Sequence, residues 1–150
     1  MTESKKQEFI NRIGQANKTE MVVVVYDIAI EYMNDIIGQL DFVKSLDMAR
    51  KSVQDLINAL NFEMPLSYNL LSLYNYVNRL LLGAKLKSDS SLVEEAKGIL
   101  SELRESFAQI ALQDKSQAMT EHTEHIVAGM TYGRGVLNES IMNSSNGFTV

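Results

Sequence analysis

From residue 17 to residue 113, apolar residues recur at steps of three and four positions, the spacing that places them on one face of an α helix. The first such segment begins at Asn17, where Glu20 three residues later completes the sequence pattern of a capping box. Its β-branched run, MVVVVY, would also suit a buried strand, but the helical spacing continues beyond it to Ile37. The pattern therefore predicts a helix from Asn17 to about Gly38.

Three further segments with the same spacing predict helices over residues 42–60, 66–84 and 91–113. The last of these begins near Ser91, and Glu94 is placed to form a second capping box. The apolar positions assigned to the core in the four predicted helices include Leu40, Leu66, Leu73 and Ile110.

Short connections between consecutive helices force neighbours to run antiparallel. The predicted fold is therefore all-α, an antiparallel up-down four-helix bundle over residues 17–113, preceded by an N-terminal arm (1–16) and followed by a C-terminal extension (114–150). Helical spacing around Met130, followed by glycines, leaves two outcomes open for the extension. It could form a short fifth helix that folds back on the bundle, or it could be disordered.

Two of the predicted helices carry a second apolar row besides the one that faces the core. In the first helix this row is Met21, Val24, Ile28 and Tyr32. In the third it is Leu71, Asn75, Asn78 and Leu82, extended by Leu86. Helices of an isolated bundle normally have one apolar stripe and one charged face. A second row therefore indicates a fifth segment packed on it, a homodimer, or a groove for a partner helix.

Composition narrows the classes of partner and compartment. The chain has 150 residues, 45% of them hydrophobic, which suits one domain with a substantial core. Its net charge of -5 and pI near 5.0 argue against a nucleic-acid partner, which needs a concentrated basic surface. Because there is no cysteine, no apolar stretch typical of a secretory signal and no run long enough to span a bilayer, we expect no membrane insertion and a soluble, cytoplasmic protein.

Three short motifs occur in the order found in one bacterial family. The stretch NKTEMVVVVYD places Glu20, Tyr26 and Asp27 at the family's spacing, and LINALNFEM matches the end of its second helix. The third and most specific motif, LYNYVNRLLLGAKLKSD, matches at Leu73, Tyr74, Tyr76, Arg79, Leu81, Ala84 and Asp89. From about Phe9 to Leu112 the chain thus resembles the FliS family, the flagellin-specific export chaperones of bacterial flagella.

The resemblance implies a cytoplasmic chaperone that binds the C-terminal segment of flagellin in apolar grooves of the bundle, prevents premature polymerisation and keeps flagellin competent for export. It also implies that the N-terminal arm covers a groove until cargo displaces it, with Phe9 and Ile13 at the matching positions. The residues that we expect to contact the partner are Val24, Ile28, Tyr32, Leu71, Asn75, Asn78 and Leu82, flanked by Tyr74 and Tyr76. The sequence leaves open whether the flagellar export gate also binds.

Other functional classes find less support in the sequence. The only two histidines, His122 and His125 in EHTEH, have metal-ligand spacing, but a dimetal bundle needs Glu-x-x-His motifs on two helices and the chain has none. A solvated helical face explains this motif more simply, so we predict no metal site, no cofactor and no enzyme activity. The remaining alternative is a structural bundle that homodimerises through its second apolar rows.

Overall fold

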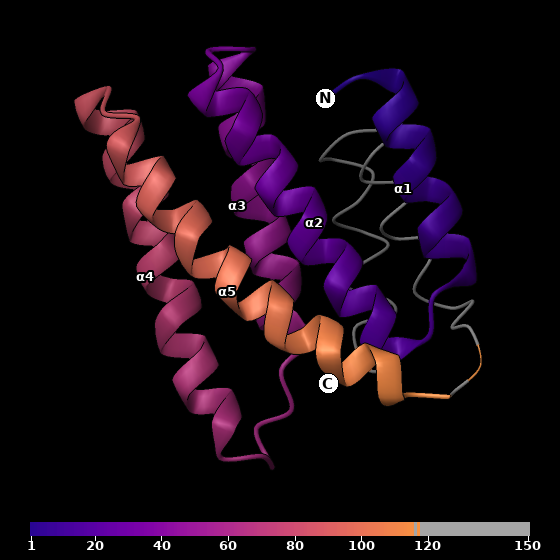
Figure 1. Cartoon of the computed structure of the whole chain (residues 1–150). Helices are drawn as coiled ribbons and strands as arrows, with labels where there is room; N and C mark the ends of the chain where they lie inside the picture. The colour runs from indigo at the N-terminus through magenta and orange to yellow at the C-terminus, as the bar shows by residue number, and fades with distance from the viewer. Residues whose placement is uncertain (116, 118–150) are drawn as a thin grey trace.

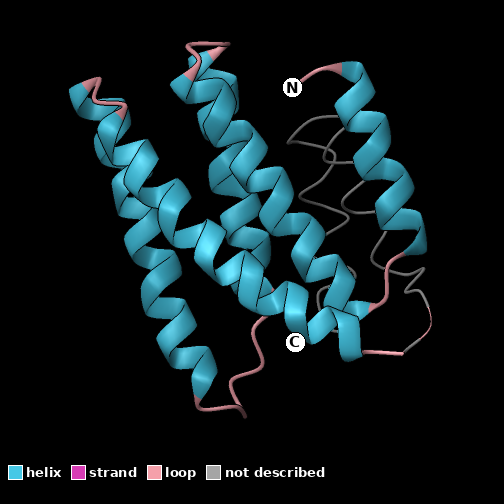
Figure 2. Ribbon diagram, in the orientation of Figure 1, coloured by secondary structure: helices cyan, strands magenta, loops and turns pink. Residues whose placement is uncertain are grey.

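The computed structural model describes residues 1–115 and 117, and every regular element in this part of the chain is an α helix (Figures 1 and 2). The helices are α1 (Glu3–Gln15), α2 (Lys18–Ile37), α3 (Phe42–Asn58), α4 (Leu66–Lys87) and α5 (Ser91–Gln113). None of these helices is long and apolar enough to cross a membrane.

Helices α2 to α5 form a four-helix bundle in which each helix lies beside two others. Helix α2 packs against α3 and α5, and α4 packs against the same two helices from the opposite side. The connections are short, so sequential helices run antiparallel (Figure 1). The predicted all-α up-down bundle is therefore confirmed. The short fifth helix considered for residues 114–150 lies outside the described residues.

The N-terminal arm is itself a helix, which the apolar spacing of the bundle segments did not indicate. Thr2 caps α1, because its side chain accepts a hydrogen bond from the backbone N–H of Lys5 at 3.2 Å. Phe9 and Ile13, one turn apart on this helix, are 2% and 0% exposed. Among the described helices, α1 packs against α2 alone. The arm thus adds a fifth helix to one side of the bundle.

The two predicted capping boxes had different outcomes. At the start of α2 the box is complete, since the Asn17 side chain accepts from the backbone N–H of Glu20 and the Glu20 side chain accepts from that of Asn17. At α5 the prediction was wrong, because Ser91 is already the first helical residue. Asp89 satisfies this end of the helix instead, where one carboxylate oxygen accepts from the Ser91 N–H at 3.0 Å and from its hydroxyl at 2.6 Å.

Helix α2 lies at the centre of the packing. Twelve of its 20 residues are buried, because α3, α5 and α1 all pack against it. This explains why its sequence is apolar on almost every side. Four positions assigned to the core are instead exposed, by 38 to 61%, because they lie beyond α2, at the ends of α4 and α5, or on the rim of α4: Leu40, Leu66, Ile110 and Leu73.

Candidate functional site

Helix α1 lies along one face of α2 and is held there by polar contacts near both of its ends. The Arg12 guanidinium donates to the Asp27 carboxylate at 2.7 Å, and the amino group of Met1 forms an ion pair with Asp35. Arg12, near the end of α1, thus contacts the first half of α2, whereas Met1, just before α1, contacts a residue near the end of α2. The two helices therefore run antiparallel. At about 100° per residue, Val24 and Ile28 occupy the same arc of α2 as Asp27 and Asp35. The α1 helix therefore lies over the part of the second apolar row of α2 that contains Val24 and Ile28.

The Asp27 carboxylate is shared between two helices that flank α2. Besides Arg12 of α1, it accepts from Arg104 of α5, whose Nε lies 2.8 Å from Oδ1 and whose Nη2 lies 3.2 Å from Oδ2. The hydrogen bonds to Asp27 raise the pKa of the Arg104 guanidinium. Since Arg104 engages both carboxylate oxygens, Asp27 would keep an ionic partner if α1 moved away.

Three predicted contact residues on α2 are buried. Val24, Ile28 and Tyr32 are 2%, 4% and 3% exposed, and they belong to the same hydrophobic cluster as Phe9 and Ile13. The second row was explained in three ways: a fifth segment packed on it, a homodimer, or a groove for a partner helix. For α2, the structure corresponds to the first, because α1 packs against this helix. These three side chains can meet a partner only after whatever covers them has moved.

A pocket of about 290 Å³ opens where the end of α1 meets the start of α2 and the end of α5. Its lining is Arg12, Gln15, Ala16, Glu20, Val23, Val24, Ala108 and Ala111. This volume can admit a large apolar side chain. The pocket continues the α1-covered face of α2 to the surface at one end.

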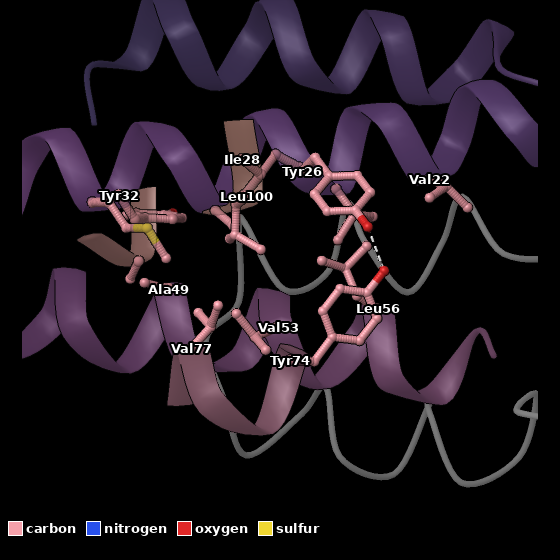
Figure 3. Close-up of a cluster of buried hydrophobic side chains, with 14 of the residues drawn as sticks. Val22, Tyr26, Ile28, Tyr32, Ala49, Val53, Leu56, Tyr74, Val77 and Leu100 are labelled. Atoms are coloured by element: carbon pink, nitrogen blue, oxygen red, sulfur yellow. Dashed lines mark hydrogen bonds between the residues drawn. The ribbon is translucent and has the colours of Figure 1, made fainter. Parts of the chain in front are cut away.

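Tyr74 is placed in the core rather than at the flank of a docking surface. Its hydroxyl forms a hydrogen bond with that of Tyr26 on α2, and the two side chains point toward one another in Figure 3. Tyr26 and Tyr74 are 0% and 1% exposed, and burial raises the pKa of both, in Tyr74 to about 12. Position 74 belongs to the core row of α4 because it lies one turn from Leu70 and from Val77.

The other predicted contacts on α4 lie on its outward side. Asn75 and Leu82 are exposed, whereas Leu71, Tyr76 and Asn78 are half-buried. The Tyr76 hydroxyl donates to Glu95 of α5 at 2.6 Å, which raises the pKa of the tyrosine. Asn75 and Leu82 are thus accessible in this state of the protein, in contrast to the α2 residues. Leu71 and Tyr76 also pack against the hydrophobic cluster, and the Oδ1 atom of Asn78 is buried.

The sequence did not indicate two features of this region. One is the ionic link from Arg12 through Asp27 to Arg104, whose members are 15 and 77 positions apart and share no pattern. The other is an aromatic contact in which the rings of Phe62 and Tyr68 lie 5.3 Å apart at the entry to α4. Both residues are substantially exposed, so an apolar surface extends from the α3–α4 loop onto α4.

The described part of the chain offers no cluster of metal ligands. Across residues 1–115 and 117, no group of three or more His, Asp or Glu side chains could hold a metal ion. The EHTEH motif with His122 and His125 lies outside the described residues.

Two comparisons with known proteins agree with each other. A family model described as flagellar protein FliS matches residues 1–114. The flagellar secretion chaperone FliS of Bacillus subtilis (strain 168) is 25% identical to this chain over 108 residues, which cover 66% of the chain and 79% of that relative. The matched region contains all five helices of the described structure.

Proposed function

The chain belongs to the FliS family, and we propose that it is a cytosolic export chaperone that binds the C-terminal segment of flagellin. Bound in this way, flagellin is kept from polymerising before export. Cargo of this kind enters as an amphipathic helix whose apolar face fills a groove on the chaperone. Such binding suits this bundle, because its helices carry more apolar surface than its own core buries.

The observation that carries the proposal is the packing of α1 on α2. A 13-residue amphipathic helix from the chain's own N-terminus lies on an apolar face of α2, with Phe9 and Ile13 as its buried anchors. A cargo helix would adopt the same geometry on this face. Because Arg104 holds Asp27 independently of Arg12, removing α1 leaves no unpaired carboxylate at this place.

We propose that α1 is displaced when cargo binds, which uncovers Val24, Ile28 and Tyr32. The outer row on α4, with half-buried Leu71 and exposed Leu82, would then serve a second part of the same cargo segment. A flagellin segment that orders on binding loses conformational entropy, so a large wrapped surface is expected rather than a single short contact.

The test is calorimetric titration of a peptide from the C-terminal 40 or so residues of the host's flagellin. The full-length protein is compared with a Phe9→Ala, Ile13→Ala double variant, which weakens α1 docking without changing the surface beneath it. We expect saturable binding, a gain in peptide helicity, and binding at least about tenfold tighter in the double variant, because less work is needed to displace α1. Gln7→Ala, an exposed position on α1, is the matched control and should bind as the wild type does.

Two results would count against the proposal. The absence of peptide binding to both proteins would rule out flagellin's C-terminal segment as the ligand. Weaker binding in the double variant would mean that Phe9 and Ile13 contact cargo directly, so that α1 forms part of the site and does not cover it.

A further inference from the structure

Helix α2 carries a row of carboxylates along the face that α1 covers. At about 100° per residue these side chains fall within an arc of about 80°, which also contains Val24. The members of this row, which we call the acidic row, are Glu20, Asp27, Glu31 and Asp35. No lysine or arginine occurs between the first of them and the end of α2. Any helix that packs on the covered face therefore passes several negative charges and no positive one.

The two middle members of the acidic row are best placed to bind a basic residue of another helix. Glu20 is held in the capping box of α2, and Asp35 is only 8% exposed. Asp27 and Glu31 are half-buried, and their spacing of four residues puts both carboxylates on the same side of the helix. Asp27 carries the ion pair with α1, whereas Glu31 forms no ion pair within the part of the chain that the structure describes.

Removing α1 would change the balance of charge around Asp27. The Oδ2 atom of this residue accepts from Arg12 at 2.7 Å and from Arg104 at 3.2 Å, and Arg104 also donates to Glu105 at 3.0 Å. With α1 in place, two guanidinium groups thus serve two carboxylates. Without Arg12, one guanidinium group remains for both, and Oδ2 keeps only the longer of its two contacts. A cation on an incoming helix would restore the balance.

Helix α1 neutralises only part of the acidic row. Because α1 and α2 run antiparallel, the residue one turn before Arg12 lies level with the residue one turn after Asp27. These two residues are Glu8 and Glu31, which have the same charge. Both lysines of α1 pair with glutamates of their own helix, at 3.4 Å in each case. A helix with a second basic residue at the level of Glu31 would therefore match α2 better than α1 does.

From this mismatch we propose that the ligand of the α1-covered face is an amphipathic helix with two basic residues four positions apart beside its apolar row. One basic residue takes the place of Arg12 on Asp27, and the other pairs with Glu31. The proposal rests on the function proposed above, because it specifies the chemistry of the cargo helix that displaces α1. It makes Asp27 a carboxylate that passes from an internal partner to an external one.

The test is a set of calorimetric titrations with the C-terminal flagellin peptide, in which each lysine and arginine is replaced singly by glutamine. The full-length wild type is compared with Asp27→Asn and Glu31→Gln, which remove one charge each and keep the shape of the side chain. We expect two basic residues of the peptide, four positions apart, whose replacement weakens binding to the wild type at least about tenfold.

Each of these two peptide residues should lose its effect in one chaperone variant, the first in Asp27→Asn and the second in Glu31→Gln. Double-mutant cycles cancel whatever a substitution does to α1 by itself, so the coupling reports on the ion pair alone. Glu102→Gln, exposed on α5, is the matched control and should couple to no peptide residue. A peptide that binds without any such coupling would overturn the inference and leave flagellin binding intact. A peptide that does not bind at all would contradict the proposed function instead.

Hydrogen exchange of the α1 amides supplies a second readout that needs no cargo. Glu8→Lys gives α1 the basic residue that it lacks at the level of Glu31, so α1 should open less often and its amides should exchange at least about threefold more slowly. The effect should disappear when Glu31→Gln is added. Gln7→Lys, which adds a cation at another exposed position of α1, is the control and should leave exchange unchanged. Equal exchange in Glu8→Lys and the wild type, or equal slowing by Gln7→Lys, would show that the acidic row does not select the charge of its partner helix.

Discussion

The hydroxyl pair of Tyr26 and Tyr74 makes a quantitative prediction about the core. It joins α2 to α4 across the bundle, and both side chains are almost completely buried. Replacing Tyr26 with phenylalanine keeps the ring, including its contact with Phe107 at a centroid distance of 5.5 Å, but leaves the Tyr74 hydroxyl buried without this partner. A buried polar group that loses its hydrogen bond costs about 1–3 kcal/mol.

The Tyr26→Phe and Tyr74→Phe variants should therefore each lower the free energy of unfolding by about 1–3 kcal/mol. In the double variant neither hydroxyl remains to be desolvated, so the loss should be smaller than in either single variant. The coupling between the two sites should be at least as large as one single loss.

Urea unfolding followed by far-UV circular dichroism measures these differences, provided that the denaturant slope is equal in all four proteins. Tyr68→Phe, at a position that is 58% exposed, is the control and should change stability by less than about 0.5 kcal/mol. If the losses of the two single variants simply add in the double variant, the hydroxyls do not act as a pair and the reasoning fails.

Two further predictions concern alkaline pH and helix propensity. Burial raises the pKa of Tyr32 and Tyr74 to about 12 and that of Tyr26 further. Above the unfolded pKa near 10, the folded state therefore keeps protons that the unfolded state releases. The free energy of unfolding then falls by about 1.4 kcal/mol per pH unit for each of these groups. Helicity should be lost cooperatively as the pH rises above about 10, together with a rise in tyrosinate absorbance; tyrosines that all titrate near pH 10 in a protein still fully helical would contradict this. Gly98→Ala should raise the free energy of unfolding by about 0.5–1 kcal/mol in urea titrations, because alanine favours a helix and an added Cβ on α5 meets nothing within 4 Å. A loss of stability would show that the space around position 98 on α5 is not open.

The periodic segments of the bundle could be predicted from sequence because each signal is local. The capping box of α2 lies within four residues, and apolar spacing defines α3 and α4 without reference to the rest of the chain. The error at the start of α5 has the same origin. Ser91 and Glu94 fit a capping box by spacing alone, but in the structure it is Asp89 that accepts the hydrogen bond of the Ser91 N–H.

The candidate site was harder to predict from the sequence, because it depends on which helix packs over which face of α2 and α4. Spacing identified a second apolar row on α2, yet could not show that α1 lies over Val24 and Ile28. The one-turn spacing of Tyr74 from Leu70 and Val77 places it on the core row of α4, but its hydrogen bond to Tyr26 on another helix could not be predicted. Contacts of this kind join residues that are distant in the chain, so no local pattern carries them.

The two apolar faces of α2 differ in how easily their partners can be exchanged. On one face α3 and α5, with 17 and 23 residues, form the core of the bundle and cannot leave without unfolding it. On the other lies α1, a helix of 13 residues, too short to be stable in water alone. Its two buried apolar anchors contribute about 1.5–3 kcal/mol each, a modest sum to overcome. A cargo helix on this face would displace α1 if it buried more apolar surface on α2 than these two anchors do.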